Sequence, residues 1–274
     1  MLVIPDKWKK KWKDKDVFEQ LLALKGIVRK EKEGRRTSIF SLDGKNYYIK
    51  FYRGVGWKKI FRNLFEFRLP VLDADNEWKA IHRLERLGIN TMRLVGYGKR
   101  GWNPAKRQSF VITEELAQTV SLEDFCRHWR ESVPPYGLKR RLIIEVAKIA
   151  RALHFNGINH RDFYICHFLL DISAGTHLIG HSPMKLYLID LHRVQIRRRV
   201  PLRWRVKDIA ALYFSSMDLG LTQRDLMRFI RVYEGVPLKD ALKKHRVFWW
   251  RVRRRAAALY RKAVRKGLIP QQWD

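Results

Sequence analysis

Residues 159–171 read "NHRDFYICHFLLD" and place a charged triplet, residues 160–162, ahead of an apolar run. The preceding segment, residues 138–157, has apolar residues at helical spacing and predicts an amphipathic helix that Gly157 can end. The run "FLLD" and the later "KLYLID", which ends at Asp190, predict the two strands of a short hairpin around the insert "ISAGTHLIGHSPM". The triplet therefore lies on a loop between a buried helix and a hairpin.

Two aspartates in this arrangement suit the transfer of a phosphoryl group. One aspartate accepts the proton of the acceptor hydroxyl, and a second holds Mg²⁺ on the phosphates of the nucleotide. We predict that Asp162 takes the first role and that Asp190 takes the second. The triplet resembles the catalytic loop of protein kinases, in which an asparagine five residues after the aspartate holds a metal ion.

His167 stands at the position of that asparagine. Imidazole binds divalent metal ions, although it prefers softer ions than Mg²⁺. His167 could instead donate a hydrogen bond to a phosphate, or it could only close the loop. The working hypothesis places it in the metal site with Asp190.

A kinase also needs a strand lysine that holds the α- and β-phosphates, and a helix glutamate that orients this lysine. Lys50 lies in the predicted strand "YYIKFY", and Glu77 lies in the predicted helix 74–89. A single lysine in a strand is often only the solvent-facing residue of an alternating pattern. Glu85 competes with Glu77 for the second role, but the arginines beside Glu85 indicate an exposed helix face.

Two further stretches belong to the expected nucleotide site. "EGRRT" lies in the predicted turn where kinases have a glycine-rich loop, but its one glycine is Gly34. Arg35 and Arg36 could compensate by their charge, or they could simply be exposed. "ITEEL" resembles the hinge between kinase lobes, where backbone groups meet adenine, and we place Glu114 and Leu116 there.

Composition limits the class of protein. The chain has 274 residues, enough for one large domain or two lobes, and 58 Lys and Arg against 27 Asp and Glu give it a net charge of +31. Such a surface attracts nucleic acid, an anionic membrane face or a phosphorylated substrate. The two cysteines, Cys126 and Cys166, cannot form a disulfide framework, which favours a reducing compartment. With no signal-peptide core and no uncharged stretch of about 18 residues, we expect a cytoplasmic protein that could sit on a membrane surface.

Strand patterns dominate the first part of the chain and helical patterns the second. Residues 27–52 predict three strands with a hairpin turn at Asp43-Gly44, and "MRLVGYG" and "SFVITEEL" predict two more. Helical patterns follow, beginning with "SLEDFCRHWRE", which Ser121 can cap. This order predicts an α+β protein with two lobes. We divide the chain into a basic N-terminal segment (1–25), a β-rich lobe (26–116) and a helical lobe with basic C-terminal helices (117–274).

Four stretches together resemble the lipopolysaccharide core heptose(I) kinases of Gram-negative bacteria, a family within the protein-kinase-like superfamily. They are "NHRDFYICHFLLD", "LIDLHRVQ", "RWRVKDIAALYFS" and "PVLDADNEWKAIHRL", and the resemblance covers roughly residues 10–240. It implies a bilobal protein-kinase-like fold with a small β-rich N-lobe and a larger helical C-lobe. It also implies phosphorylation of the first heptose of the inner core, at O4, with ATP and Mg²⁺ as cofactors.

The family pattern also implies roles for single residues. It places Asp162 as the catalytic base, and it places Asp190 at the metal-binding position of the kinase Asp-Phe-Gly motif. Leu-His-Arg at 191–193 follows instead, and the missing glycine argues against a flipping activation segment. Asp208 resembles the buried aspartate that steadies the catalytic loop. Phe163 stands where relatives usually carry Cys, which should alter packing beside the base without removing a catalytic group.

The resemblance gives the positive charge a purpose, because the acceptor would be a lipid-linked sugar beside acidic sugars at the inner face of a membrane. Basic amphipathic segments at 54–70 and 243–266 suit an anionic membrane surface, although they could equally be solvated helices. Some relatives associate with an acyl carrier protein, an acidic partner for which the sequence shows no specific motif. Two alternatives stay open: a kinase of the same fold that acts on another core sugar (Kdo) or on protein, and a basic nucleic-acid-binding module. The second does not explain a lysine, a glutamate and two aspartates in kinase order, so we expect no nucleic acid.

Overall fold

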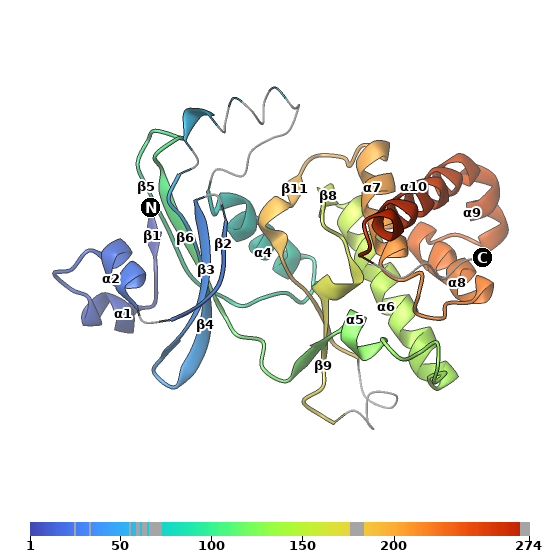
Figure 1. Cartoon of the computed structure of the whole chain (residues 1–274), viewed down its shortest axis with the longest axis horizontal. Helices are drawn as coiled ribbons and strands as arrows, with labels where there is room; N and C mark the ends of the chain where they lie inside the picture. Colours follow the sequence, from blue (N-terminus) through green and yellow to red (C-terminus); the bar gives the residue numbers. More distant parts are fainter. Residues whose placement is uncertain are drawn as a thin grey trace. The chain divides into compact units, whose positions relative to one another are not determined.

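The chain divides into two compact units in the computed structural model (Figure 1). The structure describes residues 1–24, 26–32, 34–54, 56–58, 61, 65, 73–175 and 184–268. The first unit comprises residues 1–85, 91–117 and 191–193, and the second comprises residues 86–90, 118–190 and 194–274. Each unit is described by itself.

The first unit is built on a six-stranded antiparallel sheet with the strand order β1-β5-β6-β4-β3-β2. Its strands are β1 (Leu2–Val3), β2 (Ile27–Lys32), β3 (Arg35–Leu42), β4 (Lys45–Tyr52), β5 (Leu94–Arg100) and β6 (Gln108–Glu114), and its helices are α1 (Asp6–Lys11), α2 (Val17–Ala23) and α4 (Asp75–Arg86). The alternating patterns predicted every strand except β1. The expected hairpin turn is confirmed, because Asp43 and Gly44 have φ of 53° and 74°, as a two-residue turn of this type requires.

Residues 1–24 form part of this unit's core. Trp8, Trp12 and Phe18 are at most 6% exposed. The ring of Trp8 packs edge-on against Tyr47 of β4, with ring centroids 5.2 Å apart. The basic N-terminal segment is therefore a pair of short helices whose aromatic residues are buried against the sheet and whose lysines stay in water.

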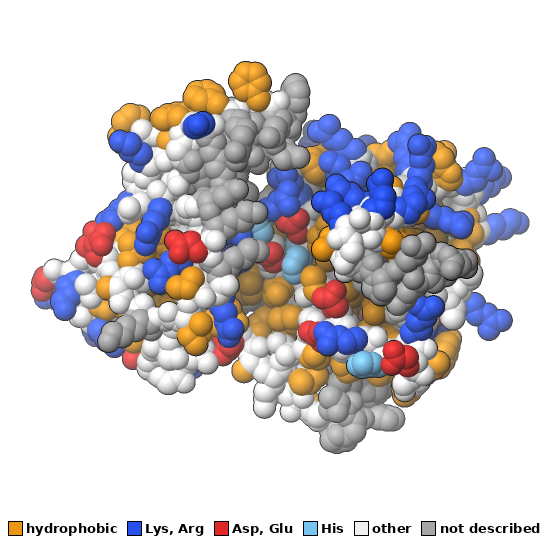
Figure 2. All heavy atoms as spheres, in the orientation of Figure 1, with side chains coloured by type: hydrophobic (Ala, Val, Ile, Leu, Met, Phe, Trp, Pro, Cys, Tyr) orange, Lys and Arg blue, Asp and Glu red, His pale blue; other side chains and the backbone are white. Residues whose placement is uncertain are grey.

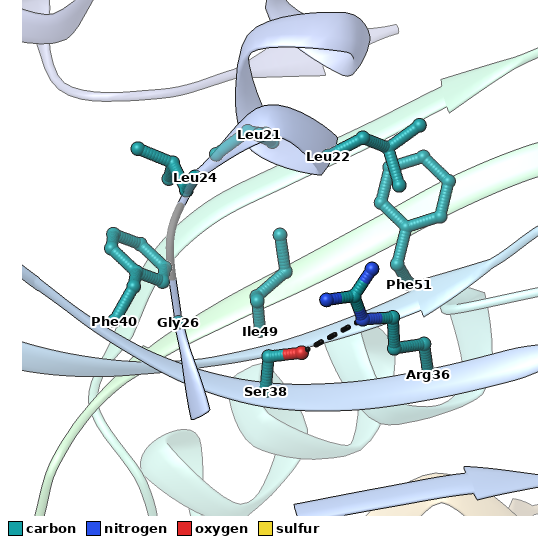
Figure 3. Close-up of a pocket in the computed structure, with 9 residues that line it drawn as sticks. All are labelled: Leu21, Leu22, Leu24, Gly26, Arg36, Ser38, Phe40, Ile49 and Phe51. Carbon is teal, nitrogen blue, oxygen red and sulfur yellow. Dashed lines mark hydrogen bonds between the residues drawn. The ribbon is translucent and has the colours of Figure 1, made fainter. Parts of the chain in front are cut away.

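A small pocket shows how α2 is seated on the sheet (Figure 3). The residues that line it are Leu21, Leu22, Leu24, Gly26, Arg36, Ser38, Phe40, Ile49 and Phe51. Arg36 donates from Nε to the Ser38 hydroxyl at 3.2 Å, so its head is engaged inside this pocket (Figure 3).

The second unit is mainly helical and carries two small antiparallel sheets, with the orders β10-β9-β7 and β11-β8. Its strands are β7 (Thr119–Ser121), β8 (Ile158–Asn159), β9 (Phe168–Asp171), β10 (Leu186–Leu188) and β11 (Gln195–Ile196). Its helices are α5 (Leu122–Phe125), α6 (Tyr136–Phe155), α7 (Leu202–Phe214), α8 (Gln223–Glu234), α9 (Leu238–Lys244) and α10 (Arg246–Arg265). The predicted hairpin after the charged triplet is confirmed as β9 and β10.

The sequence patterns predicted two helices of this unit, one of them with the wrong length. The long amphipathic helix is confirmed as α6, and Gly157 after it has φ of 79°. The helix expected from "SLEDFCRHWRE" is confirmed at its Ser121 cap but wrong in length, because α5 ends at Phe125. Cys126 and Trp129 lie in the turns that follow. Consecutive turns can bury apolar residues at the same spacing as a helix. The sequence pattern could therefore not distinguish one long helix from a short helix followed by turns.

The apolar side of the basic C-terminal segment is buried. Helix α10 packs along α7 (Figure 1), and its buried residues are Phe248, Val252, Ala256, Tyr260 and Ala263. Val247 and Trp250 are its large apolar residues with more than half of their surface exposed, at 58% and 56%. The other basic segment, 54–70, lies mostly outside the described residues. Within the described ranges, no helix is both long enough and apolar enough to cross a bilayer.

Candidate active site

Lys50 and Glu77 form a buried ion pair in the first unit. Lys50 Nζ lies 2.7 Å from Glu77 Oε1, and the two side chains are 17% and 1% exposed. Lys50 sits in the middle of β4, where it pairs with Thr37 of β3 and Val111 of β6. The sheet therefore fixes the lysine backbone, and the first turn of α4 brings the carboxylate to it.

The competing glutamate is excluded as the partner of this lysine. Glu85 is 48% exposed and pairs with His82 at 3.2 Å, on the outer face of α4. An isolated buried charge is unfavourable, so each of these two buried groups needs the other as its partner. The sequence did not show whether the Lys50 side chain faces solvent. In the structure it faces Glu77 and is mostly buried.

Gly34 lies in the turn between β2 and β3 with φ of 83°. Its carbonyl accepts the N–H of Arg53 at 2.8 Å. A Cβ at this position would come within 2.5 Å of the Gly54 carbonyl oxygen, so the backbone approach itself demands glycine. Packing alone accounts for this glycine, whether or not a phosphate lies near it.

The expected hinge residues lie at the end of β6. Glu114 is the last residue of this strand, and its carboxylate contacts Lys45 at 2.6 Å and Arg93 at 3.3 Å. The hydrogen bond from Lys45 lowers the pKa of Glu114 below its ordinary value. Leu116 follows two residues later. Since the Glu114 side chain is occupied by cations, any contact with adenine here would come from the backbone.

The catalytic loop of the second unit is fixed by one buried carboxylate. Asp208 of α7 is 1% exposed and accepts the backbone N–H groups of His160 and Arg161, at 2.6 and 2.9 Å. These are the two residues directly before Asp162. Asp208, which the sequence suggested as the aspartate that steadies this loop, therefore holds the backbone of His160 and Arg161.

A directed chain of hydrogen bonds continues behind this carboxylate. Arg205 Nε donates to the Tyr233 hydroxyl at 2.9 Å, and this hydroxyl lies 2.8 Å from His154 Nδ1. Because a guanidinium can only donate, the tyrosine proton is left for His154 Nδ1. His154 then carries its own proton on Nε2, which lies 3.3 Å from the Asp208 carboxylate. No motif in the sequence pointed to Tyr233 or His154.

Two residues of the site have strained backbones. Arg161 and Asp190 have φ of 74° and 60°, a region that residues other than glycine rarely adopt. Such conformations cost on the order of 1–3 kcal/mol each and cluster at functional sites. The residue before Asp190 is held through both of its backbone groups: the Ile189 carbonyl lies 3.0 Å from His160 Nε2, and the Ile189 N–H donates to the His167 carbonyl at 3.0 Å.

His160 is fully buried between these strained residues. Burial lowers the pKa of its imidazole below the ordinary value, which favours the neutral ring. The Nε2 proton is then the one donated to the Ile189 carbonyl. Phe163 is also buried, and its ring packs against His160 and Phe168 at centroid distances of 5.6 and 5.2 Å. It fills core space next to Asp162 in the chain.

His167 uses its two ring nitrogens differently. Nδ1 lies 2.7 Å from the Asp162 carbonyl oxygen, which can only accept, so Nδ1 carries the proton. In the neutral ring, Nε2 then has a lone pair, and it lies 3.7 Å from the Asp190 carboxylate. A lone pair and a carboxylate that face each other in this way could share one cation.

These donors fit a divalent ion that arrives with a nucleotide. In the described part of the chain, no three His, Cys, Asp or Glu side chains gather into a metal cage. Mg²⁺ commonly keeps several waters and is held by one or two carboxylates plus substrate phosphates. Asp190 would supply the carboxylate, and His167 would supply a nitrogen better suited to softer ions.

Comparisons with known proteins agree on one family. The model of the Lipopolysaccharide kinase (Kdo/WaaP) family matches residues 19–233. The chain is 48% identical to the lipopolysaccharide core heptose(I) kinase WaaP of Escherichia coli, over 94% of this chain and 96% of the relative. It is 47% identical to the protein of the same name from Pseudomonas aeruginosa, over 97% of this chain and 98% of the relative. A solved structure titled "WaaP in complex with acyl carrier protein" matches with a TM-score of 0.80 and 43% identity, over 95% of this chain and 99% of that one.

Proposed function

Because this chain belongs to the lipopolysaccharide kinase (Kdo/WaaP) family, we propose that it transfers the γ-phosphoryl group of ATP to O4 of the first heptose in the lipopolysaccharide inner core. The curated relatives are named core heptose(I) kinases, and the match covers almost their full length. The predicted kinase class and protein-kinase-like fold are confirmed. The nucleic-acid-binding alternative is set aside, because the family match spans both units.

The observation that carries this proposal is the geometry around Asp162. Its backbone follows the two N–H groups that Asp208 fixes, and its carbonyl holds the ring of His167. Asp162 is therefore presented by a rigid loop, which is what a base needs if it is to meet one hydroxyl in one orientation. Asp162 accepts the hydroxyl proton as the acceptor oxygen attacks the γ-phosphorus.

The nucleotide contacts are assigned by the roles that single residues have in kinases. Lys50, oriented by Glu77, contacts the α- and β-phosphates, while the turn at Gly34 approaches them with backbone. The backbone of Glu114 and Leu116 meets adenine. Asp190 and His167 would hold the divalent ion, which would supply positive charge to neutralise the nucleotide phosphates.

Phosphate transfer from labelled ATP to core lipopolysaccharide that lacks the heptose phosphate tests the activity. We expect transfer by the wild type that stops when a chelator removes the divalent ion. Asp190→Ala should weaken the affinity for Mg·ATP, and Lys50→Ala should raise KM for ATP more than KM for the acceptor. Unchanged Mg·ATP affinity in both variants would remove these residues from the nucleotide site.

We also propose an acyl carrier protein as a partner, with its acyl chain in an apolar cavity of the second unit. The structural neighbour is a complex with such a protein. The cavity has a volume of about 490 Å³, within the range of ligand pockets of roughly 300–1,000 Å³. Its lining includes Leu142, Ile143, Ile209, Leu212 and Leu226, with Arg246 and Arg253 among the charged residues. Arginines at an apolar cavity suit a carrier that is acidic and brings a hydrocarbon chain.

Filling the cavity tests this partnership. Ile143→Trp should weaken binding of the acylated carrier protein and leave binding of the unacylated carrier protein unchanged. Equal loss for both forms would show that the substitution damaged a surface rather than the chain site. If the wild type binds the acylated and the unacylated carrier protein equally well, the cavity is not the site of the acyl chain.

We propose that the enzyme works at the inner face of the inner membrane, where its lipid-linked acceptor would lie. Its net charge of +31 supports attraction to anionic headgroups. Because the apolar side of α10 is buried, this attraction is electrostatic and does not depend on insertion of that helix.

A further inference from the structure

A network of charged side chains holds the start of helix α4 against the sheet of the first unit. Lys99 of β5 lies between two carboxylates, with its Nζ 2.5 Å from Asp75 Oδ2 and 3.1 Å from Asp73 Oδ2. Arg107, the residue before β6, donates to the same Asp73 oxygen at 3.1 Å. The Tyr97 hydroxyl donates to the other carboxylate oxygen of Asp75. We call these five residues the α4 anchor.

Backbone hydrogen bonds hold the same turn of the chain. The first N–H groups of a helix have no partner within it, so other groups must accept them. Asp73 Oδ1 accepts the backbone N–H of Asp75 at 3.1 Å, and the Ser109 hydroxyl of β6 accepts the backbone N–H of Ala74 at 3.0 Å. Ala74 and Ser109 are fully buried. The start of α4 is therefore tied to the sheet through side chains and through its backbone.

The central ion pair of the α4 anchor keeps its charges although it is largely buried. Burial alone would raise the pKa of Asp75, but the hydrogen bonds from Lys99 and Tyr97 bring it below its ordinary value. Burial alone would lower the pKa of Lys99, but Asp75 and Asp73 raise it above its ordinary value. Lys99 and Asp75 are 25% and 20% exposed. Water screens such a pair less than an exposed pair, so the loss of one partner has a larger effect.

The turn held in this way carries the glutamate that pairs with Lys50. Glu77 follows Asp75 by two residues in the first turn of α4. Its carboxylate lies 2.7 Å from Lys50 Nζ. Because the α4 anchor and Glu77 share one helical turn, a shift of this turn moves the carboxylate with it. A shift of about 1 Å would take the pair beyond the distance of a good hydrogen bond.

We propose that Lys99 is a positioning residue, which holds α4 so that Glu77 orients Lys50 toward the nucleotide. This inference rests on the proposed function, because it concerns the same nucleotide site. Protein kinases need their strand lysine and helix glutamate paired, and they control activity through the position of that helix. The α4 anchor keeps the helix in the position that pairs the two residues.

The first test measures Kd for Mg·ATP with the full chain. Lys99→Met keeps the apolar stem of the side chain and removes its charge. We expect Kd for Mg·ATP to rise on the order of tenfold, a size typical of residues coupled through one ion-pair network, while KM for the acceptor stays unchanged. Lys99→Arg keeps the charge and should restore most of the affinity.

A double-mutant cycle shows whether Lys99 acts through Glu77. Glu77→Gln removes the charge that orients Lys50. In that background, Lys99→Met should add little further loss of Mg·ATP affinity, because the group that it positions is already disabled. If the two substitutions instead weaken binding by factors that multiply, Lys99 acts independently of Glu77 and the inference is wrong.

Two further variants control for charge and for folding. Lys106→Met makes the same substitution at an exposed lysine shortly before β6, and it should bind Mg·ATP like the wild type. Tyr97→Phe removes one hydroxyl from the α4 anchor and keeps the ring, whose centroid lies 5.1 Å from that of Trp78. It should weaken Mg·ATP binding in the same direction as Lys99→Met and by a smaller factor, and it decides the question if Lys99→Met does not fold.

Two more results would overturn the inference. One is a lower melting temperature in Lys99→Met and Tyr97→Phe with unchanged Kd for Mg·ATP, which would make the α4 anchor purely structural. The other is an equal loss of affinity in Lys106→Met, which would assign the effect to overall charge.

Binding and turnover separate this inference from the proposed function. A wild type whose Mg·ATP affinity depends on Lys99 but that never phosphorylates core lipopolysaccharide would refute the proposed function alone. A wild type that phosphorylates it with a Mg·ATP affinity indifferent to Lys99 would refute this inference alone.

Discussion

We propose that His167 combines two roles that looked like alternatives in the sequence. Its Nδ1 closes the loop on the Asp162 carbonyl, and this contact turns Nε2 toward Asp190. An asparagine at this place has a shorter side chain, and its carbonyl oxygen suits a hard cation such as Mg²⁺. In the proposed site the histidine would therefore keep a donor that faces the metal ion but change its chemistry.

Substitution of His167 should separate these two roles. We expect His167→Ala to be severely impaired, because it removes both the loop contact and the donor. His167→Asn should retain part of the activity, and it should lose more of its rate with Mn²⁺ than with Mg²⁺, because imidazole favours the softer ion. The measurement is kcat across titrations of both ions, with melting temperatures as the control for folding. Wild-type activity in His167→Ala would show that the ring is only structural.

The sequence suggested candidates for the chemistry of the site, but it did not point to the residues that support them. The order of Lys50, Glu77, Asp162 and Asp190 could be read directly, because each type is needed at a fixed place along the chain. Burial of the Lys50 side chain could not be predicted, since alternation along a strand does not say which face of the strand is buried. Tyr233 and His154 were missed because they act through Asp208 and touch no motif.

At the scale of elements, three helices cooperate to hold the catalytic loop. Helix α7 supplies Asp208, α6 supplies His154 and α8 supplies Tyr233. Because each hydrogen bond in this chain has a defined donor, loss of one member leaves the next without its partner. We therefore expect Tyr233 to act as a positioning residue for Asp162, through His154 and Asp208.

Tyr233→Phe should lower kcat several-fold while KM for ATP stays unchanged. It also leaves His154 Nδ1 and Arg205 Nε buried without this hydroxyl, which costs about 1–3 kcal/mol. Tyr260→Phe is the control, because its hydroxyl donates to Asp218 at 3.1 Å, outside this chain of hydrogen bonds. Steady-state kinetics and denaturant unfolding of both variants decide the matter. Loss of stability in both without any change of kcat in Tyr233→Phe would make the tyrosine merely structural.

Gly157 joins α6 to the small β8–β11 sheet. A Cβ there would collide with the carbonyl oxygen of Arg197, and its φ of 79° already disfavours any other residue. We expect Gly157→Ala to destabilise folding by about 2 kcal/mol or more. Gly137→Ala, in the first turn of α6 with open space around it, should be neutral or stabilise by up to about 1 kcal/mol. Equal unfolding free energies for the two variants would contradict this account.

Element types were predictable from the sequence wherever periodicity was long. The strands of the first unit, α6 and the β9–β10 hairpin all follow from pattern and turn residues. The length of α5 and the burial of α10 do not, because both depend on what packs against them. An amphipathic basic helix has the same pattern whether its apolar side meets a membrane or, as here, another helix.

At the scale of the molecule, charge is the dominant surface property. Lys and Arg side chains gather over α7 and α10 on the visible face (Figure 2). In α10, Arg261, Lys262 and Arg265 are exposed. Their exposure makes them candidates for contact with an anionic membrane.

Binding to vesicles should therefore depend on charge and salt. We expect flotation with vesicles that contain acidic lipid, and loss of flotation at high salt, because screening shortens the reach of surface charges to a few ångströms. Replacement of Arg261, Lys262 and Arg265 by Gln should weaken binding more than the same replacement of Lys9, Lys10 and Lys11 in α1, although both remove three charges. Binding that ignores lipid charge would contradict an electrostatic attachment.

We propose that this kinase uses Asp162 as the base when it phosphorylates the first heptose at O4. The most direct measurement is the mapping of the phosphate after reaction of ATP with purified core lipopolysaccharide that lacks the heptose phosphate. We predict one new phosphate on O4 of the first heptose, no transfer to material that already carries it, and a rate at least about 10²-fold lower for folded Asp162→Asn. Phosphate on Kdo or on protein, or near-normal turnover by Asp162→Asn, would contradict the account.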